Sequence, residues 1–132
     1  MNPILSWALR LVPAIILAQT LPFKFSGAPE SKEIFTKLTE KAFGNDSLEE
    51  LMRIGTGALE LVCVVLLLMP KFCKQGAVLT IFAMGGALMS HTIFIGFKGS
   101  HGTLAFLAFL ALISCFVFLV KSYLSEDPRK PK

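Results

Sequence analysis

Charged residues are scarce in this 132-residue chain: they make up 17% of it, whereas hydrophobic residues make up 54%. A soluble domain of this size needs more polar surface than this composition supplies, and the mean hydropathy of +0.67 agrees. The composition therefore excludes an ordinary soluble domain. It indicates a single membrane-protein domain, residues 1–132, whose first partner is the lipid bilayer.

Cysteine, tryptophan and tyrosine are also rare, with three, one and one copies respectively. The cysteines, at positions 63, 73 and 115, show no CxxC spacing, and two of them lie within apolar runs, so packing is their expected role. The formal net charge of +4 comes from basic residues spread over loops and tail without interleaved aromatic residues. This pattern argues against a nucleic-acid partner.

Four long apolar runs predict transmembrane helices at residues 3–23, 52–70, 76–97 and 102–121. In helical form, at about 1.5 Å per residue, each run is long enough to cross a hydrocarbon core of roughly 30 Å. The first run carries Arg10 inside its apolar stretch and no convincing cleavage site follows it. We therefore expect a retained helix there rather than a cleaved signal peptide.

The connection between the first two spans contains a short amphipathic helix, predicted at residues 30–43. Apolar side chains recur there at helical spacing among charged ones, which is typical of a helix lying at the membrane surface. Gly44 suits its C-cap, and Ser47 with Glu50 forms a capping-box pattern that predicts the start of the next helix. We expect residues 125–132 to form a disordered tail.

The links between the last three spans are short, so consecutive helices are predicted to be antiparallel neighbours. The expected fold is all-α: an up-down four-helix transmembrane bundle with the surface helix between helices one and two. Lysine and arginine near the helix ends favour both termini in the cytoplasm. The last span carries a strip of small residues on which another helix can pack closely: Ala105, Ala108, Ala111 and Cys115.

One acid, Glu60, lies near the middle of the second span. It shares a helix face with Arg53, Thr56, Gly57 and Cys63, so this face is expected to point into the bundle. An ionised carboxylate at mid-membrane costs about 3 kcal/mol, which the flanking leucines and valines offset. Inside the bundle the acid must be protonated or paired with a cation.

Arg10 is the cation at the most similar depth, so an Arg10–Glu60 pair is geometrically allowed. His91, Gln19 and Lys24 form a second polar layer nearer the outer face. Arg10 and Gln19 lie half a turn out of phase, so they share a partner only if Pro13 bends the helix.

Two interpretations of these polar residues stay open. They form either a buried network that fixes helix register or a ligand site. Haem ligation usually needs a second histidine opposite His91, and His101 is expected in or beside the outer loop. The sequence offers no cysteine, histidine and carboxylate cluster for a metal, and no nucleophile paired with a base, so we expect no independent catalysis.

The chain resembles the DoxX family of small bacterial membrane proteins over nearly its whole length. The resemblance rests on three stretches in the right order: "RLVPAIILAQTLPFKFSGAPES", "RIGTGALELVCVVLLLMP" and "GAVLTIFAMGGALMSH". It implies a four-helix protein of the bacterial inner membrane, with the family's typical polar positions occupied by Arg10, Gln19, Lys24, Glu60 and His91. It also implies one of two roles, since some relatives are subunits of quinone-linked redox complexes and others are similar to proteins that assist ion-channel assembly.

Two functional hypotheses follow. In the first, the protein is an accessory subunit of a membrane redox system, and its inward polar face holds a quinone or other small lipophilic molecule. The expected ligand-lining residues are Phe23, Thr56, Gly57, Met84 and Ala87. In the second, it is a non-enzymatic assembly factor that docks client membrane proteins, for example through the alanine strip. A homo-oligomer is compatible with either, and a transporter is disfavoured because one four-helix unit lacks inverted repeats.

Overall fold

The computed structural model describes residues 2–126, which form an all-helical fold without any strand in that range. The elements are α1 (Pro3–Ser26), α2 (Pro29–Phe43), α3 (Glu49–Leu68), α4 (Cys73–Ser90), the π-helical turn η1 (His91–Ile95) and α5 (Ser100–Ser125). Of the predicted tail at residues 125–132, Ser125 ends α5 and Glu126 follows it, while residues 127–132 lie outside the described part.

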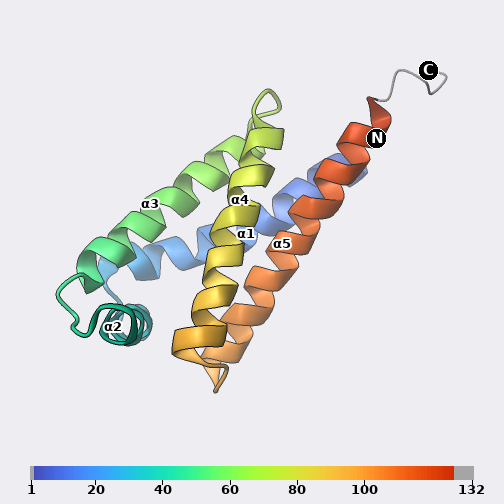
Figure 1. The fold of residues 1–132 in the computed structure, drawn as a ribbon. Coiled ribbons are helices and arrows are strands. Elements are labelled where there is room, and N and C mark those ends of the chain that lie inside the picture. The colour runs from blue at the N-terminus through green and yellow to red at the C-terminus, as the bar shows by residue number, and fades with distance from the viewer. Residues whose placement is uncertain (1, 127–132) are drawn as a thin grey trace.

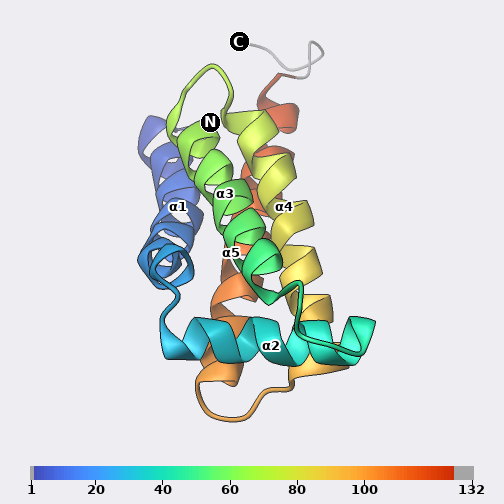
Figure 2. The same cartoon turned by 90° about the vertical axis from the view of Figure 1, so that its left-hand side faces the viewer.

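Four long helices form the predicted up-down bundle (Figure 1). Each packs against two neighbours: α1 against α3 and α5, and α4 against the same two helices. The spans that begin at Pro3, Glu49, Cys73 and His101 are long and apolar enough to cross a membrane. The chain is thus a multi-pass membrane protein, and the beginning of α1 and the end of α5 lie at the same end of the bundle (Figure 2).

The helices extend beyond the apolar runs that predicted them. α3 begins at Glu49 rather than at residue 52, α4 begins at Cys73 rather than at residue 76, and α5 continues to Ser125 rather than ending at residue 121. Counting apolar residues finds only the part of a helix that suits the hydrocarbon, whereas the backbone hydrogen bonds continue into the polar ends. Pro70 explains why α3 stops early, at Leu68, because a residue before proline disfavours the helical conformation.

The capping box predicted for the second span does not form. The backbone N–H and the hydroxyl of Ser47 both contact Asn45 Oδ1, so the serine is used in a local turn. The N-cap position of α3 falls on Leu48, which supplies no side-chain acceptor.

α2 lies across the end of the bundle remote from the beginning of α1 (Figure 2). It packs against α3 and η1, with Phe35, Leu38 and Thr39 buried beneath it. Gly44 caps it in the left-handed conformation, at φ 79°, and donates its N–H to Glu40 O. The predicted surface helix and its glycine cap are therefore confirmed, and α2 closes this end of the bundle.

The small-residue strip of α5 packs inside the bundle. Its four members are at most 6% exposed, and Ala108 and Ala111 share a core cluster with Ile16, Leu17 and Met84. Small side chains let the helices approach closely, and Ser114 donates across the gap to the backbone oxygen of Leu9 at 2.9 Å. The strip is therefore covered by the protein's own helices.

Gly76 marks a close approach of α4 to α3. A Cβ atom built at this position would lie 2.7 Å from the backbone nitrogen of Leu67 and 2.8 Å from Leu66 Cβ. Only glycine fits this crossing without a shift of backbone. The contact holds α4 against the end of α3, which is where the first of the buried arginines binds.

Candidate functional site

Two buried arginines join α1 to α3 in a reciprocal way. Arg10, on α1, donates from Nε to the backbone oxygen of Leu67 in the last turn of α3, at 2.7 Å. Arg53, on α3, donates from Nη1 to the backbone oxygen of Lys24 in the last turn of α1, and from Nε to Glu49 Oε1 at 2.7 Å. Carbonyl groups in a last helical turn lack partners within the helix and carry its negative dipole end, so a guanidinium suits them. The two contacts fix the antiparallel register of α1 and α3.

Glu60 is buried, and its cation is Lys24. Lys24 Nζ lies 2.8 Å from Glu60 Oε2, and the exposed fractions of the two side chains are 13% and 6%. Thr20 completes the cluster: its hydroxyl accepts from Lys24 Nζ at 3.0 Å and lies 3.2 Å from Glu60 Oε2 and 2.9 Å from Leu17 O. The hydroxyl proton serves one of these two oxygens at a time. The carboxylate is therefore compensated by a charge and lies within reach of a hydroxyl donor.

The expected Arg10–Glu60 pair does not form. The pair was predicted because Arg10 and Glu60 were expected at similar depths in the membrane. That comparison did not consider how far α3 is displaced along α1. The arginine contacts place Arg10 level with Leu67, two turns of α3 away from Glu60, and they place Glu60 level with the region of Leu17 and Thr20. The long side chain of Lys24 reaches back toward the beginning of α1, as helical side chains do, and meets the acid there.

Arg10 has no acidic partner among the described residues. It is 4% exposed, its Cζ lies 4.1 Å from the centre of the Trp7 ring, and its Nη2 is buried without a hydrogen-bond partner in that part of the chain. The permanent positive charge of Arg10 is thus stabilised by the face of the Trp7 indole and by one backbone oxygen. One donor of the guanidinium is still available to an acceptor.

His91 and His101 lie side by side. His101 stands beside the loop that joins the last two spans, as expected, and this position also brings its ring next to that of His91. Their ring centroids are 6.5 Å apart, and both residues are buried, at 6% and 8% exposure. His91 begins the π-helical turn, and His101 belongs to the first turn of α5. The ring nitrogens His91 Nε2 and His101 Nδ1 are both buried without a partner in the described structure.

α2 supplies the charges over this histidine pair. Lys37 Nζ lies 3.0 Å from Glu33 Oε1 and 3.5 Å from His101 Nε2, and the same Glu33 oxygen lies 3.8 Å from His101 Nε2. The hydrogen bond and the charge of Lys37, and more weakly His101, hold the pKa of the Glu33 carboxyl below its ordinary value. Glu33 is therefore an acceptor for both neighbours near neutral pH.

The inward stripe of α3 is confirmed, since Arg53, Gly57, Glu60 and Cys63 are buried and Thr56 is half-buried. Gly57 meets the ring of Phe25, with 3.1 Å between a built Cβ and the nearest ring carbon.

The other expected site residues are scattered. Gln19 is exposed while Arg10 is buried, as their half-turn offset indicates. Phe23 faces outward at 56% exposure, Met84 belongs to the core, and Ala87 is half-buried. Their predicted ligand-lining role remains a prediction, and the structure does not gather them around one space.

Sequence reasoning missed several residues of these clusters, namely Thr20 and His101 and, on α2, Glu33 and Lys37. Thr20 stands one turn before Lys24, a spacing that could have placed its hydroxyl beside the lysine. His101 follows a short link, which returns the chain to the end of the preceding helix. Within residues 2–126, no group of three or more histidine, cysteine or acidic side chains could hold a metal ion.

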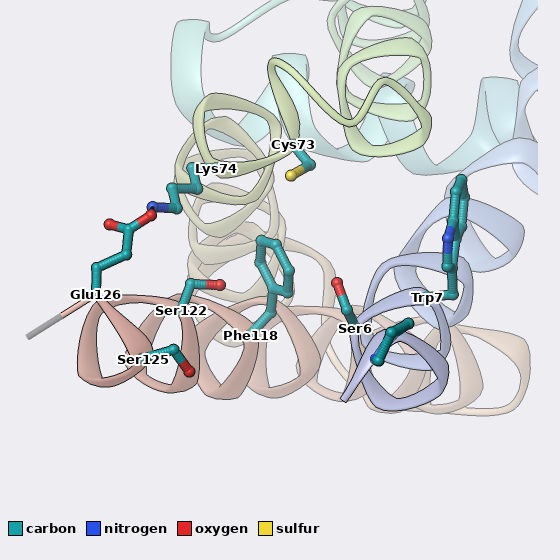
Figure 3. Close-up of a pocket in the computed structure, with 9 residues that line it drawn as sticks. Ser6, Trp7, Cys73, Lys74, Phe118, Ser122, Ser125 and Glu126 are labelled. Carbon is teal, nitrogen blue, oxygen red and sulfur yellow. Dashed lines mark hydrogen bonds and ion pairs between the residues drawn. The ribbon is translucent and has the colours of Figure 1, made fainter. Parts of the chain in front are cut away.

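A pocket of about 330 Å³ opens between α1, α4 and α5, at the end of the bundle opposite α2 (Figure 3). Trp7 and Phe118 form its apolar walls. Figure 3 shows Ser6 and Cys73 turned toward the space, with the ion pair between Lys74 and Glu126 at its edge. The remaining lining residues are Pro3, Ser122 and Ser125. No sequence pattern predicted this pocket, because three distant segments build it.

Comparison with family models, with curated proteins and with solved structures gave no match. The DoxX resemblance therefore rests on the sequence stretches alone. The structure establishes a four-helix membrane bundle, and the function must be argued from its sites.

Proposed function

We propose that this protein is a non-catalytic accessory subunit of a membrane redox system, and that the pocket between α1, α4 and α5 holds the head group of a quinone-like lipophilic molecule. In this proposal it resides in the bacterial inner membrane with both termini in the cytoplasm. The observation that carries the proposal is the pocket itself, with aromatic walls, hydroxyl donors and an ammonium group at one end of a transmembrane bundle.

The size and chemistry of the pocket support this choice. Its volume of about 330 Å³ falls in the range of ligand pockets, which begin at roughly 300 Å³. A quinone head is a flat ring with carbonyl oxygens at opposite edges. Trp7 and Phe118 offer ring faces, and Ser6, Ser122 and Lys74 offer donors. The apolar tail of such a molecule would leave the pocket between helices into lipid.

Arg10 adds a second argument. Its guanidinium contacts Trp7, one of the residues that line the pocket, and its buried Nη2 has no acceptor in the described chain. A ligand carrying an acceptor oxygen would supply the hydrogen-bond partner that Arg10 Nη2 lacks. The Glu60 cluster offers no such opening, because Lys24 and Thr20 already surround the carboxylate. This is why the proposed ligand site moves from the middle of the bundle to its end.

The only tryptophan of the chain lines the pocket, which makes the test direct. Protein purified into quinone-free nanodiscs should show saturable quenching of Trp7 fluorescence when a short-chain quinone is added. Ser122→Leu, which fills the pocket, should weaken this binding by at least about tenfold, a change of roughly 1.4 kcal/mol. The matched control is Ser90→Leu, because Ser90 lies on α4 outside the pocket and bonds only to its own helix at Gly86 O. Quenching that never saturates, or that both variants reduce equally, would refute the proposal.

A second candidate function is supported by the aromatic surface of α4 and α5. Four phenylalanines there are more than half exposed: Phe82, Phe106, Phe109 and Phe116. Because the alanine strip is buried, an assembly factor would dock its client on this phenylalanine surface instead. A photo-crosslinking residue at position 106 distinguishes the two cases in cells. Capture of a defined membrane protein supports docking, whereas capture of lipid alone contradicts it.

A further inference from the structure

The histidine pair lies far from the pocket, at the end of the bundle that α2 covers. The chain reverses direction between the two histidines through Gly96 and Gly99, which adopt φ values of 91° and 59° that favour glycine. The π-helical turn that begins at His91 places its ring beside that of His101, with an angle of 59° between the ring planes. Single π-helical turns occur frequently at functional sites.

The hydrogen bond of His91 fixes its tautomer. Nδ1 lies 2.9 Å from Ala87 O, and a carbonyl oxygen can only accept, so Nδ1 carries the proton. Nε2 of the neutral ring therefore presents a lone pair. That nitrogen is buried and has no donor among the described residues. A histidine whose Nδ1 donates to a backbone carbonyl while Nε2 is available has the arrangement of a metal-ligating imidazole.

His101 has the complementary arrangement. Its Nε2 faces two groups of α2: the carboxylate of Glu33, 3.8 Å away, and the ammonium of Lys37, 3.5 Å away, which the same Glu33 oxygen also holds. The ammonium can only donate and the carboxylate can only accept, so the choice of partner sets the tautomer of His101. With Nε2–H directed toward Glu33, Nδ1 presents a lone pair, and this nitrogen is also buried without a partner. The carboxylate acts as the outer partner that orients a ligating histidine. In the tautomer that donates to Glu33, two imidazole lone pairs are buried at one place, and neither has a donor among the described residues.

From this arrangement we propose that His91 and His101 bind one monovalent, low-coordinate transition-metal ion, of which Cu(I) is the representative. Imidazole nitrogen suits copper, zinc, iron and nickel. Zinc usually takes four ligands, whereas no third histidine, cysteine or acid within residues 2–126 completes a cluster here. A site of two neutral donors, with the Lys37 ammonium close to one of the rings, favours the ion with the lower charge and the smaller ligand requirement.

The spacing accommodates such an ion. A metal–nitrogen bond is about 2.0 Å, so nitrogens on opposite sides of one ion are about 4 Å apart. The two unpartnered nitrogens make no direct hydrogen bond, and the ring centroids are separated by 6.5 Å. Small rotations about the side-chain bonds would bring both lone pairs onto one ion. The site does not depend on the proposed quinone pocket.

The test is a Cu(I) titration of the full-length protein in nanodiscs under anaerobic conditions, against bicinchoninate as a competing chelator. The Cys73→Ser background removes the half-buried thiol, which could bind copper by itself. We expect one copper per chain, and His101→Ala should weaken binding by roughly tenfold or more. Gln19→Ala, at an exposed position of α1, is the control and should leave the affinity unchanged.

X-ray absorption at the copper edge adds a readout that needs no histidine variant. It should show two nitrogen ligands and no sulfur. Failure to compete with the chelator would overturn the proposal, as would sulfur ligation or equal binding by the protein without either histidine. Stoichiometric binding of Zn²⁺ in preference to Cu(I) would overturn the assignment of the ion. A site that holds only water would give no copper signal and would refute the proposal as well.

Discussion

Replacing Glu60 by Gln tests the buried ion pair at the centre of the fold. The change keeps the shape of the side chain but removes the charge that compensates Lys24, whose Nζ lies 2.8 Å from the carboxylate. Breaking a buried pair costs about 3–5 kcal/mol when the remaining charge stays buried. Lys24 is 13% exposed and stands in the last turn of α1, so its ammonium can turn partly toward the membrane surface. We therefore expect a loss near the lower limit, about 3 kcal/mol.

The measurement is the free energy of unfolding in mixed micelles, followed by circular dichroism as the denaturing detergent increases. Lys24→Met should cost at least as much, because Glu60 lies deeper and its carboxylate cannot turn out to the surface. The double variant Lys24→Met with Glu60→Leu removes both charges and should recover most of the loss. The matched control, Glu30→Gln, changes an exposed acid and should alter the free energy by less than about 0.5 kcal/mol.

Two outcomes of these measurements would contradict the buried ion pair. If Glu60→Gln and Lys24→Met each changed the free energy of unfolding by less than about 0.5 kcal/mol, the acid would be protonated or solvated in the membrane, and the pair would not exist there. If the losses were large but additive in the double variant, the two groups would be stabilising independently.

Three further predictions use contacts elsewhere in the fold. Gly76→Ala should destabilise the protein by about 1–3 kcal/mol, because the added methyl group clashes with the backbone of α3. Gly85→Ala, whose methyl group meets open space, should stabilise the protein by about 0.5–1 kcal/mol. Unfolding in mixed micelles compares the two variants, and equal effects would contradict the close crossing. Ala111→Leu should lower the free energy of unfolding by about 1–3 kcal/mol because the position is fully buried, whereas Phe116→Leu on the outer surface should change it little. If Ala111→Leu left the protein stably folded but abolished the binding of a client, the result would instead favour docking by the alanine strip. The pKa of Glu33 is lowered in the folded state, so its contribution to the stability of the fold is present above the ordinary glutamate pKa and is lost as pH falls through the lowered value. The melting temperature of Glu33→Gln should therefore decline less than that of the wild type between about pH 6 and about pH 3.

The sequence predicted most of the fold because the relevant signals are local. Long apolar runs give spans, short links give antiparallel neighbours, and the strip from Ala105 to Cys115 gives a packing face. Gly44 was identified as a cap because its neighbours along the chain reveal it. The exact helix ends were not predicted, since polar residues near the ends, such as Lys74 and Ser125, lie outside any hydropathy signal.

The site was predicted only in part, because its contacts depend on register. The inward face of Glu60 follows from helical periodicity, but the identity of its cation depends on how far α3 is displaced along α1. That displacement is set by two arginine contacts with backbone oxygens, and backbone oxygens leave no mark in a sequence. The same limit applied to His101, whose distance from His91 depends on the π-helical turn.

The reciprocal arginine contacts also constrain how the chain can be made. When α1 leaves the ribosome, Arg10 brings a permanent charge to the bilayer, and the oxygen that binds it belongs to a helix that has not yet been synthesised. Arg53 of α3 in turn binds the backbone oxygen of Lys24 in the last turn of α1. We therefore expect α1 to become fully stable in the bilayer only after α3 has been inserted beside it.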